Sequence, residues 1–232
     1  MVHSKALVVG VGDGLSASLA RLFHAEGYEV VLSARDIGKI SALRQETGAQ
    51  VVACDASNPA QVQKMMDCIE GSLGICVYNP SYRQRGPLVD LDPAEVERSI
   101  RVTAFGSFLV GQAAARRMLE QNDEGTGRGA ILFTGASAGV KGFAQSAPFA
   151  MGKFAQRGLA QSMARELHPQ GIHVAWVNID GAIRNPGRSE PDEKPQSMLD
   201  PDEIARNYLA LIRQNRSAWT DELTLRPWVE RF

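Results

Sequence analysis

The stretch ALVVGVGDGLS, residues 6–16, decides the fold of this chain. Its first four residues form an apolar run that predicts a short buried strand, and the glycines that follow predict a tight turn. A helix comes next, since Leu15, Leu19, Leu22 and Phe23 recur at the spacing of one helix face. A buried strand, a glycine turn and an amphipathic helix together indicate the first half of a β-α-β unit.

The remaining chain alternates between apolar runs and helix signals in the same way. Further strands are expected at Val30–Ser33, Val51–Cys54, Ile75–Tyr78, Ala130–Phe133 and Ile172–Val177, with an edge strand at Thr220–Leu225. Helices are expected after Asn58-Pro59, from Asp92-Pro93 to about Leu119, over Ser146–Leu167, and from Asp200-Pro201 to about Gln214. Asp92 and Glu95 have the spacing of a capping box. Polar runs at 185–200 and 122–129 predict a long and a shorter loop.

Strands that are apolar along their whole length need helices on both faces of their sheet. We therefore predict one α/β domain over residues 1–232, with a Rossmann-like, doubly wound parallel sheet. Ligands of such sheets bind at the carboxyl ends of the strands, near the point where the strand order reverses. The loops that join each strand to the next helix are thus the places to look for chemistry.

Charge balance and cysteine content narrow the function. The 25 Lys and Arg against 26 Asp and Glu give a net charge of −1, so no basic field for nucleic acid or an acidic membrane is expected. No apolar run approaches the ~18 residues of a membrane-spanning helix. Cys54, Cys68 and Cys76 include no CxxC pair, which favours a reducing, cytoplasmic location over disulfides or zinc. The histidines show no metal-ligand spacing, and His168 and His173 are expected to be polar surface groups.

The glycine turn carries the first resemblance to a known family. A glycine turn alone is weak evidence, and the GxGxxG spacing does not fit, because Leu15 stands at its third glycine. The spacing of Gly10, Gly14 and Ser16 resembles the TGxxxGxG loop of the short-chain dehydrogenase/reductase family instead. Val9 then stands for the threonine and Ser16 for the last glycine.

The resemblance extends over most of the chain, from about residue 5 to 225. Asn79-Pro80-Ser81 after the fourth strand is similar to the family's NNAG loop, with Tyr78 in place of the first Asn. Residues 101–106 resemble its VNxxG stretch, and 148–153 its YxxxK stretch. The resemblance implies a nicotinamide dinucleotide cofactor and no metal. The implied contact residues are Gly10, Gly12, Asp13, Gly14, Leu15, Arg35, Asp55, Ala56, Asn79, Lys153 and Ile183.

The catalytic positions depart from the family pattern. Where the resemblance implies Tyr, Lys, Ser and Asn, this chain has Phe149, Lys153, Ala136 and Thr103. Phe has no ionisable proton, and general acid–base catalysis is worth ~10²–10⁴ in rate. Ala cannot polarise a carbonyl, which costs a further ~10²–10³. The family's usual proton transfer cannot run with these residues.

Phe149 and Lys153 each allow two interpretations. An aromatic residue in a helix usually packs, and a lone lysine is usually solvated. In this context Phe149 also fits a catalytic tyrosine that has been replaced, and its i, i+4 spacing to Lys153 puts both on one helix face. Lys153 then donates to the ribose hydroxyls of the cofactor, as the resemblance implies.

Other residues are candidates for the lost roles. The hydroxyls of Ser137 and Thr134 are candidates for polarising a carbonyl, and the phenols of Tyr78 and Tyr82 for giving a proton. Each also has a structural interpretation as a packing residue or a loop cap. Asp180 after the sixth strand is a candidate base, although a turn cap is the simpler interpretation.

Cofactor preference depends on the end of the second strand. NAD-selective relatives carry an acid where Ala34 stands, whereas NADP-selective relatives often have Arg at the next position, which here is Arg35. The carboxylate of Asp13 would repel a 2′-phosphate. An ion pair between Asp13 and Arg35 would weaken both this repulsion and the attraction by Arg35. The balance favours NADP over NAD.

Two functions of different kinds remain open. The first is an NAD(P)-dependent oxidoreductase of a small carbonyl or alcohol substrate, with a non-standard proton source. The alternative is a catalytically inactive nucleotide-binding homologue that acts as a sensor or scaffold. Lyase or dehalogenase chemistry is disfavoured, because the retained Lys153 and the glycine turn at residues 10–14 indicate a bound nucleotide. Apolar residues on the helix from Asp92 and in the tail Trp219–Phe232 favour a homodimer or homotetramer.

Overall fold

A seven-stranded sheet forms the centre of the molecule in a computed structural model that describes residues 4–122 and 127–230. Every strand pair is parallel, and the strand order is β3-β2-β1-β4-β5-β6-β7. The strands are β1 (Lys5–Val9), β2 (Glu29–Ala34), β3 (Gln50–Ala53), β4 (Leu73–Tyr78), β5 (Gly129–Thr134), β6 (Ile172–Ile179) and β7 (Glu222–Leu225). The order reverses between β1 and β4, so the predicted doubly wound parallel sheet is confirmed.

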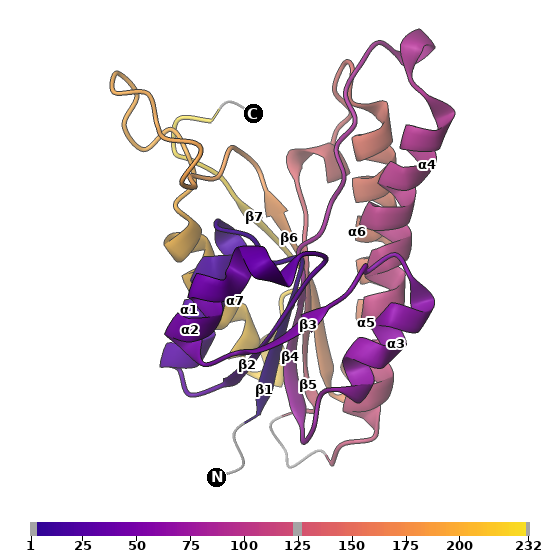
Figure 1. Ribbon diagram of the computed structural model, residues 1–232, viewed down its shortest axis with the longest axis vertical. Coiled ribbons are helices and arrows are strands. Elements are labelled where there is room, and N and C mark those ends of the chain that lie inside the picture. The colour runs from indigo at the N-terminus through magenta and orange to yellow at the C-terminus, as the bar shows by residue number, and fades with distance from the viewer. Residues whose placement is uncertain (1–3, 123–126, 231–232) are drawn as a thin grey trace.

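Helices cover both faces of the sheet, as the apolar strands require (Figure 1). One layer contains α1 (Leu15–Ala25), α2 (Ser41–Thr47) and α7 (Pro201–Ile212). The other side contains α3 (Pro59–Asp67), α4 (Pro93–Ile100), α5 (Gly106–Leu119) and α6 (Ala147–Leu167). Helix α2 is a short element that the sequence pattern did not predict. None of the helices in the described part of the chain is both long and apolar enough to span a bilayer.

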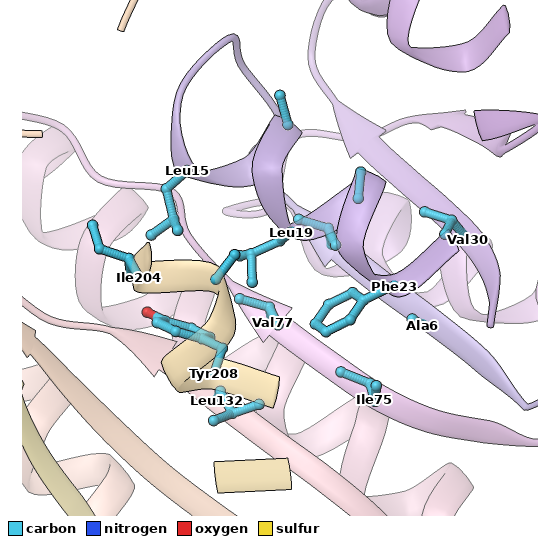
Figure 2. Packing of buried hydrophobic residues seen from close by; sticks show 14 of the residues in the cluster. Ala6, Leu15, Leu19, Phe23, Val30, Ile75, Val77, Leu132, Ile204 and Tyr208 are labelled. Atoms are coloured by element: carbon cyan, nitrogen blue, oxygen red, sulfur yellow. The ribbon is translucent and has the colours of Figure 1, made fainter. Parts of the chain in front are cut away.

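A buried apolar cluster joins α1 and α7 to the sheet (Figure 2). Leu19 and Phe23 of α1 are fully buried, as their helical spacing predicted, and Tyr208 of α7 packs beside them. Val77 of β4 points into the same cluster. Full burial of side chains of this size stabilises the fold by about 1.5–3 kcal/mol each. This packing holds the start of α1, and with it the glycine turn, in a fixed position against the sheet.

The predicted N-caps of three helices are present, with one correction. The side chains of Asn58, Asp92 and Asp200 accept hydrogen bonds from backbone amides in the first turns of α3, α4 and α7. The predicted capping box does not form, because the carboxylate of Glu95 accepts a hydrogen bond from the hydroxyl of Tyr82 instead. The phenol of Tyr82 thus takes the place of the backbone amide of Asp92 as the donor to Glu95.

The single helix predicted from Asp92 to Leu119 is interrupted by a π-helical segment, Arg101–Phe105, between α4 and α5. The wider turn frees carbonyl groups that an α-helix would use. The carbonyl of Val102 accepts from the hydroxyl of Tyr78, and that of Thr103 from the amide of Gln156 at 3.5 Å. Two tertiary hydrogen bonds therefore replace the lost helical ones.

The expectation that His168 and His173 are surface groups is wrong for His173. Its ring is buried and stacks on Trp219 with ring centroids 4.8 Å apart. His168 packs edge-on against both rings. Burial lowers the pKa of His173, although the Thr220 carbonyl that accepts from it acts in the opposite direction. The cluster fastens β6 to the segment before β7.

Two predicted segments are partly outside the described ranges. Of the loop predicted at 122–129, residues 123–126 lie outside them, and β5 already begins at Gly129. Of the tail Trp219–Phe232, the last two residues lie outside them. The long loop at 185–200 is anchored at its base by a parallel bridge between Ile183 and Leu199.

Candidate functional site

A cavity of about 960 Å³ opens at the carboxyl ends of β1, β4, β5 and β6. The loops after these strands and the start of α6 supply its walls. Its position at the reversal of strand order is the one expected for a ligand of this fold. Its volume is in the upper part of the ~300–1,000 Å³ range of ligand-binding pockets.

The glycine turn forms one end of this cavity. Gly10 has a φ of +80°, and a Cβ there would lie 2.5 Å from Cγ of Pro80, so no other residue fits. The hydroxyl of Ser16 donates to the carbonyl of Gly10 at 3.1 Å. The side-chain amide of Asn79 donates to that hydroxyl at 2.7 Å. These contacts tie the turn after β1 to the loop after β4 and fix its shape.

The start of α1 is open toward the cavity. Gly14 is the N-cap and provides no side-chain hydrogen bond, and the first turn holds no acidic residue. A Cβ on Gly12 would meet nothing within 4 Å. Free amides at the positive end of a helix dipole bind anions, and glycine lets a phosphate approach the backbone. Gly12, Gly14 and Leu15 all line the cavity, so this end fits the pyrophosphate of a dinucleotide.

Phe149 and Lys153 lie on one face of α6, as predicted. Both line the cavity, and the Lys153 Nζ lies 5.9 Å from the centroid of the Phe149 ring. The same Nζ donates to the carbonyl of Thr134 at 2.5 Å and to the side chain of Gln156 at 3.3 Å. Only 2% of Lys153 is exposed, and this burial lowers its pKa to about 7. A lysine that is only partly protonated at neutral pH therefore borders the cavity.

The end of β5 supplies one available hydroxyl. Ala136 and Ser137 line the cavity, and Ser137 is half-buried. The hydroxyl of Thr134 is buried and hydrogen-bonded to that of Tyr208 at 2.9 Å, which leaves it poorly placed for a substrate. Ser137 is thus the better of the two hydroxyls considered from the sequence. Ile183, from the loop after β6, also lines the cavity.

The structure does not bring Thr103, Tyr78 or Tyr82 into the cavity. Thr103 is fully buried, and its hydroxyl accepts from the backbone amide of Tyr82 at 3.2 Å. Tyr78 is fully buried, which raises the pKa of its phenol. The phenol of Tyr82 is held by Glu95. No tyrosine within residues 4–122 and 127–230 lines the cavity, so neither phenol replaces the missing one.

Two acidic residues considered from the sequence lie away from the chemistry. Asp13 is exposed and does not line the large cavity. In the described part of the chain it makes no ion pair with Arg35. Asp180 forms an ion pair with Arg226 at 3.2 Å, which supports a structural role.

Arg35 and Asp55 border a second, smaller cavity of about 290 Å³, together with Arg101. Asp55 accepts hydrogen bonds from the backbone and hydroxyl of Ser57, at 2.9 and 2.7 Å. Burial raises the pKa of Asp55, but the Ser57 hydrogen bonds and the charges of Arg35 and Arg101 together hold it below its ordinary value. Ala56 is buried beside Asp55. Three of the implied cofactor-contact residues, Arg35, Asp55 and Ala56, thus gather at a site separate from the large cavity. Arg35 assigns this site to the adenosine half of the cofactor.

The large cavity contains arginines that the sequence reasoning missed. Arg83 and Arg85 follow β4, and Arg188 lies in the long loop after β6. The guanidinium carbon of Arg83 lies 5.1 Å from the centroid of the Phe149 ring. The signal was present, because the run Tyr-Arg-Gln-Arg at 82–85 begins four positions after the end of a buried strand.

Comparison with known proteins supports one family. The short chain dehydrogenase family model matches residues 4–190. An uncharacterized oxidoreductase of Staphylococcus aureus (strain N315) is 26% identical over 231 residues, which is 96% of each chain. Its name gives no substrate.

Solved structures agree with this fold. A short-chain dehydrogenase from Rhodopseudomonas palustris has a TM-score of 0.82 and 31% identity, and the match covers 97% of this chain and 99% of the other. A metagenomic short-chain oxidoreductase in complex with NADP also has a TM-score of 0.82, with 27% identity over 97% of this chain and 98% of the other.

Proposed function

Because the chain belongs to the short-chain dehydrogenase family, we propose that it is an NAD(P)-dependent oxidoreductase of small carbonyl or alcohol substrates. The observation that carries this proposal is the large cavity itself. One end has an anion-binding glycine turn, and the other has the retained Lys153 with the hydroxyl of Ser137. A cavity that holds both a phosphate cradle and proton-bearing groups fits redox chemistry on a bound nucleotide.

The chain's own residues divide the work of holding the nucleotide. A bound nicotinamide dinucleotide supplies or accepts a hydride. The amides at the start of α1, with Gly10, Gly12 and Gly14, bind its pyrophosphate. Lys153 would donate to the ribose hydroxyls, and the backbone amide of Ile183, which also lines the cavity, would bind the carboxamide.

NADP is the favoured cofactor. Arg35 is exposed at the end of β2 and makes no ion pair with a carboxylate of the described residues. A forked guanidinium matches the geometry of a 2′-phosphate. The metagenomic relative in complex with NADP adds support for the same preference.

Lys153 is the proposed proton source, and Ser137 the carbonyl-polarising donor. With Phe149 in place of the phenol, Lys153 is a buried titratable group 5.9 Å from the ring centroid, and its pKa of about 7 suits proton transfer at neutral pH. Reduction of a carbonyl uses the protonated amine. The rate of reduction should therefore fall as pH rises through about 7.

The proposal is tested by oxidation of NADPH at high enzyme concentration with a panel of carbonyl compounds, followed by absorbance. Activity is expected in the wild type and in Lys64→Ala, an exposed lysine on α3. Lys153→Ala should lose at least ~10² in rate. Full activity in Lys153→Ala, or a rate that does not change with pH near neutrality, would contradict the assigned role.

A second candidate is a nucleotide-binding protein that does not catalyse. The observation that favours it is the replacement at Phe149 and Ala136, which removes two proton-handling groups from the cavity. In that case NADPH binds, but no carbonyl compound oxidises it. The nucleotide titration and the carbonyl panel together separate the two candidates.

Self-association is part of the proposal. Phe105 and Phe108 lie side by side with ring centroids 6.2 Å apart, and both are exposed. Met151 and Phe154 of α6 are about half exposed as well. Exposed apolar groups on neighbouring helices favour a homodimer or homotetramer through this face. Light scattering of the wild type against Phe108→Glu tests it, with a smaller assembly expected for the variant.

A further inference from the structure

Three arginines line the large cavity, and the guanidinium of one of them, Arg83, lies over the Phe149 ring. Arg83 and Arg85 come from the loop after β4, and Arg188 comes from the loop after β6. Burial lowers the pKa of Arg83, and the charges of Arg85 and Arg188 lower it further. Segments that are about a hundred residues apart in the sequence therefore place like charges close together.

Among residues 4–122 and 127–230, no carboxylate lines the cavity beside these charges. The residues that line the cavity include no Asp or Glu, and its charged members are Arg83, Arg85, Arg188 and Lys153. Within the described ranges none of the three arginines forms an ion pair. Arg184, four positions before Arg188, pairs with Asp200 instead. The chain has a net charge of −1, so a cavity with only cationic charges is a local feature. Its three arginines are exposed, which leaves their guanidinium groups accessible to an anion.

Specific backbone contacts hold the walls around this cluster. The backbone amide of Gly86 donates to the carbonyl of Gln145 at 3.2 Å, which fastens the arginine loop to the start of α6. Gln145 has a φ of +58°, a strained conformation for a side-chain-bearing residue. Beside it, the hydroxyl of Ser146 lines the cavity and is buried without a hydrogen-bond partner among the described residues. A buried orphan hydroxyl next to unpaired cations provides a further polar group for a ligand.

Arg83 is distinct from the place of the pyrophosphate, whereas Asn185, whose backbone pairs with that of Arg188, lies beside Gly14 of the glycine turn. The glycine turn is at the β1 end of the cavity, whereas the guanidinium of Arg83 lies over the Phe149 ring at 5.1 Å. Phe149 marks the position where the proposed reaction takes place. An anion held there belongs to the substrate and not to the nucleotide.

We propose that the substrate is a small carbonyl compound or alcohol that carries a carboxylate or phosphate group, which Arg83, Arg85 and Arg188 bind. That the bound molecule is a substrate rests on the proposed function. The anion-binding site itself is inferred from the arginines alone. Guanidinium groups form charge-assisted, often bidentate hydrogen bonds to both kinds of anion. A neutral substrate would form none of these charge-assisted bonds.

The test is calorimetric titration of the nucleotide-free protein with malonate and with inorganic phosphate, and with malonamide as the uncharged analogue of malonate. Arg83→Met and Arg188→Met should each weaken binding of at least one anion by about tenfold or more. Arg44 is an exposed arginine of α2 outside the cavity, and Arg44→Met should leave the affinity for both anions unchanged. Melting curves confirm that each variant is folded. Tighter malonate binding assigns a carboxylate substrate, and tighter phosphate binding assigns a phosphate ester.

Several results would overturn the inference. Malonamide that binds as well as malonate would show that charge is not recognised. Phosphate affinity that is equal in wild type and in both variants would place the anion at the start of α1. A separate NADPH titration distinguishes the two proposals: anion binding without NADPH binding removes the proposed function and keeps this site. NADPH binding without arginine-dependent anion binding keeps the proposed function and removes this site.

Discussion

Replacement of Lys153 by Met tests whether burial of this lysine has the cost that the structure implies. The residue is 2% exposed, and its Nζ contacts the Thr134 carbonyl and the Gln156 amide but no carboxylate of the described residues. Burial lowers its pKa from 10.5 to about 7. Met keeps the length of the side chain and removes the ammonium group.

The sign and size of the effect follow from proton linkage. Between pH 7 and 10.5 the unfolded chain holds a proton on Lys153 that the folded chain lacks. The wild type therefore loses stability as pH falls through this window, at about 1.4 kcal/mol per pH unit. The free energy of unfolding of Lys153→Met lacks this dependence. Relative to the wild type, the variant should gain about 3 kcal/mol between about pH 9.5 and about pH 7.5.

The assay is urea unfolding of nucleotide-free protein at several pH values across that window. Lys64→Met, an exposed lysine of α3, is the matched control and should differ from the wild type by a constant amount. Other titrating groups are common to all three proteins and cancel in the differences. A constant difference between wild type and Lys153→Met across the window would refute the reasoning, because it would mean that the amine is charged in the folded chain.

Three further changes test the nucleotide site and the proton chemistry. Gly10→Ala should lower the free energy of unfolding by more than ~1–2 kcal/mol in urea titrations, since φ is +80° and the new Cβ would lie 2.5 Å from Pro80. A stability equal to the wild type would contradict this geometry. Arg35→Met should raise the Kd for NADPH about tenfold and leave that for NADH unchanged in calorimetry; equal effects on both would remove the 2′-phosphate assignment. Phe149→Tyr combined with Ala136→Ser should raise the reductase rate by ~10² or more, and a flat result would show that the pocket itself has diverged.

Local patterns predicted the fold well because they arise from local physics. The apolar run before Gly10 and the helical spacing of Leu19 and Phe23 correspond to a strand and a helix that the structure contains. Asp92 and Asp200 cap helices because a carboxylate before a proline satisfies free amides in either context. Each of these features depends on neighbours within one turn of chain.

Features that depend on contacts between distant residues could not be predicted from the sequence. Nothing near Thr103 marks the π-helical segment, which is stabilised by hydrogen bonds from Tyr78 and Gln156. The burial of His173 depends on Trp219, which lies 46 positions further along the chain. The candidate site shows the same division. Phe149 and Lys153 were placed correctly by their helical spacing, but the arginines meet them only through tertiary structure.

We propose that the large cavity holds the pyrophosphate and the nicotinamide half of a dinucleotide between the glycine turn and Lys153, with the adenosine half at Arg35 and Asp55. Calorimetric titration of the wild type with NADPH tests it most directly, with Lys153→Ala as the comparison. We expect a Kd well below ~1 mM, the upper end of ordinary enzyme KM values, and weaker binding in the variant. No binding of NADPH or NADH up to about that concentration would contradict it.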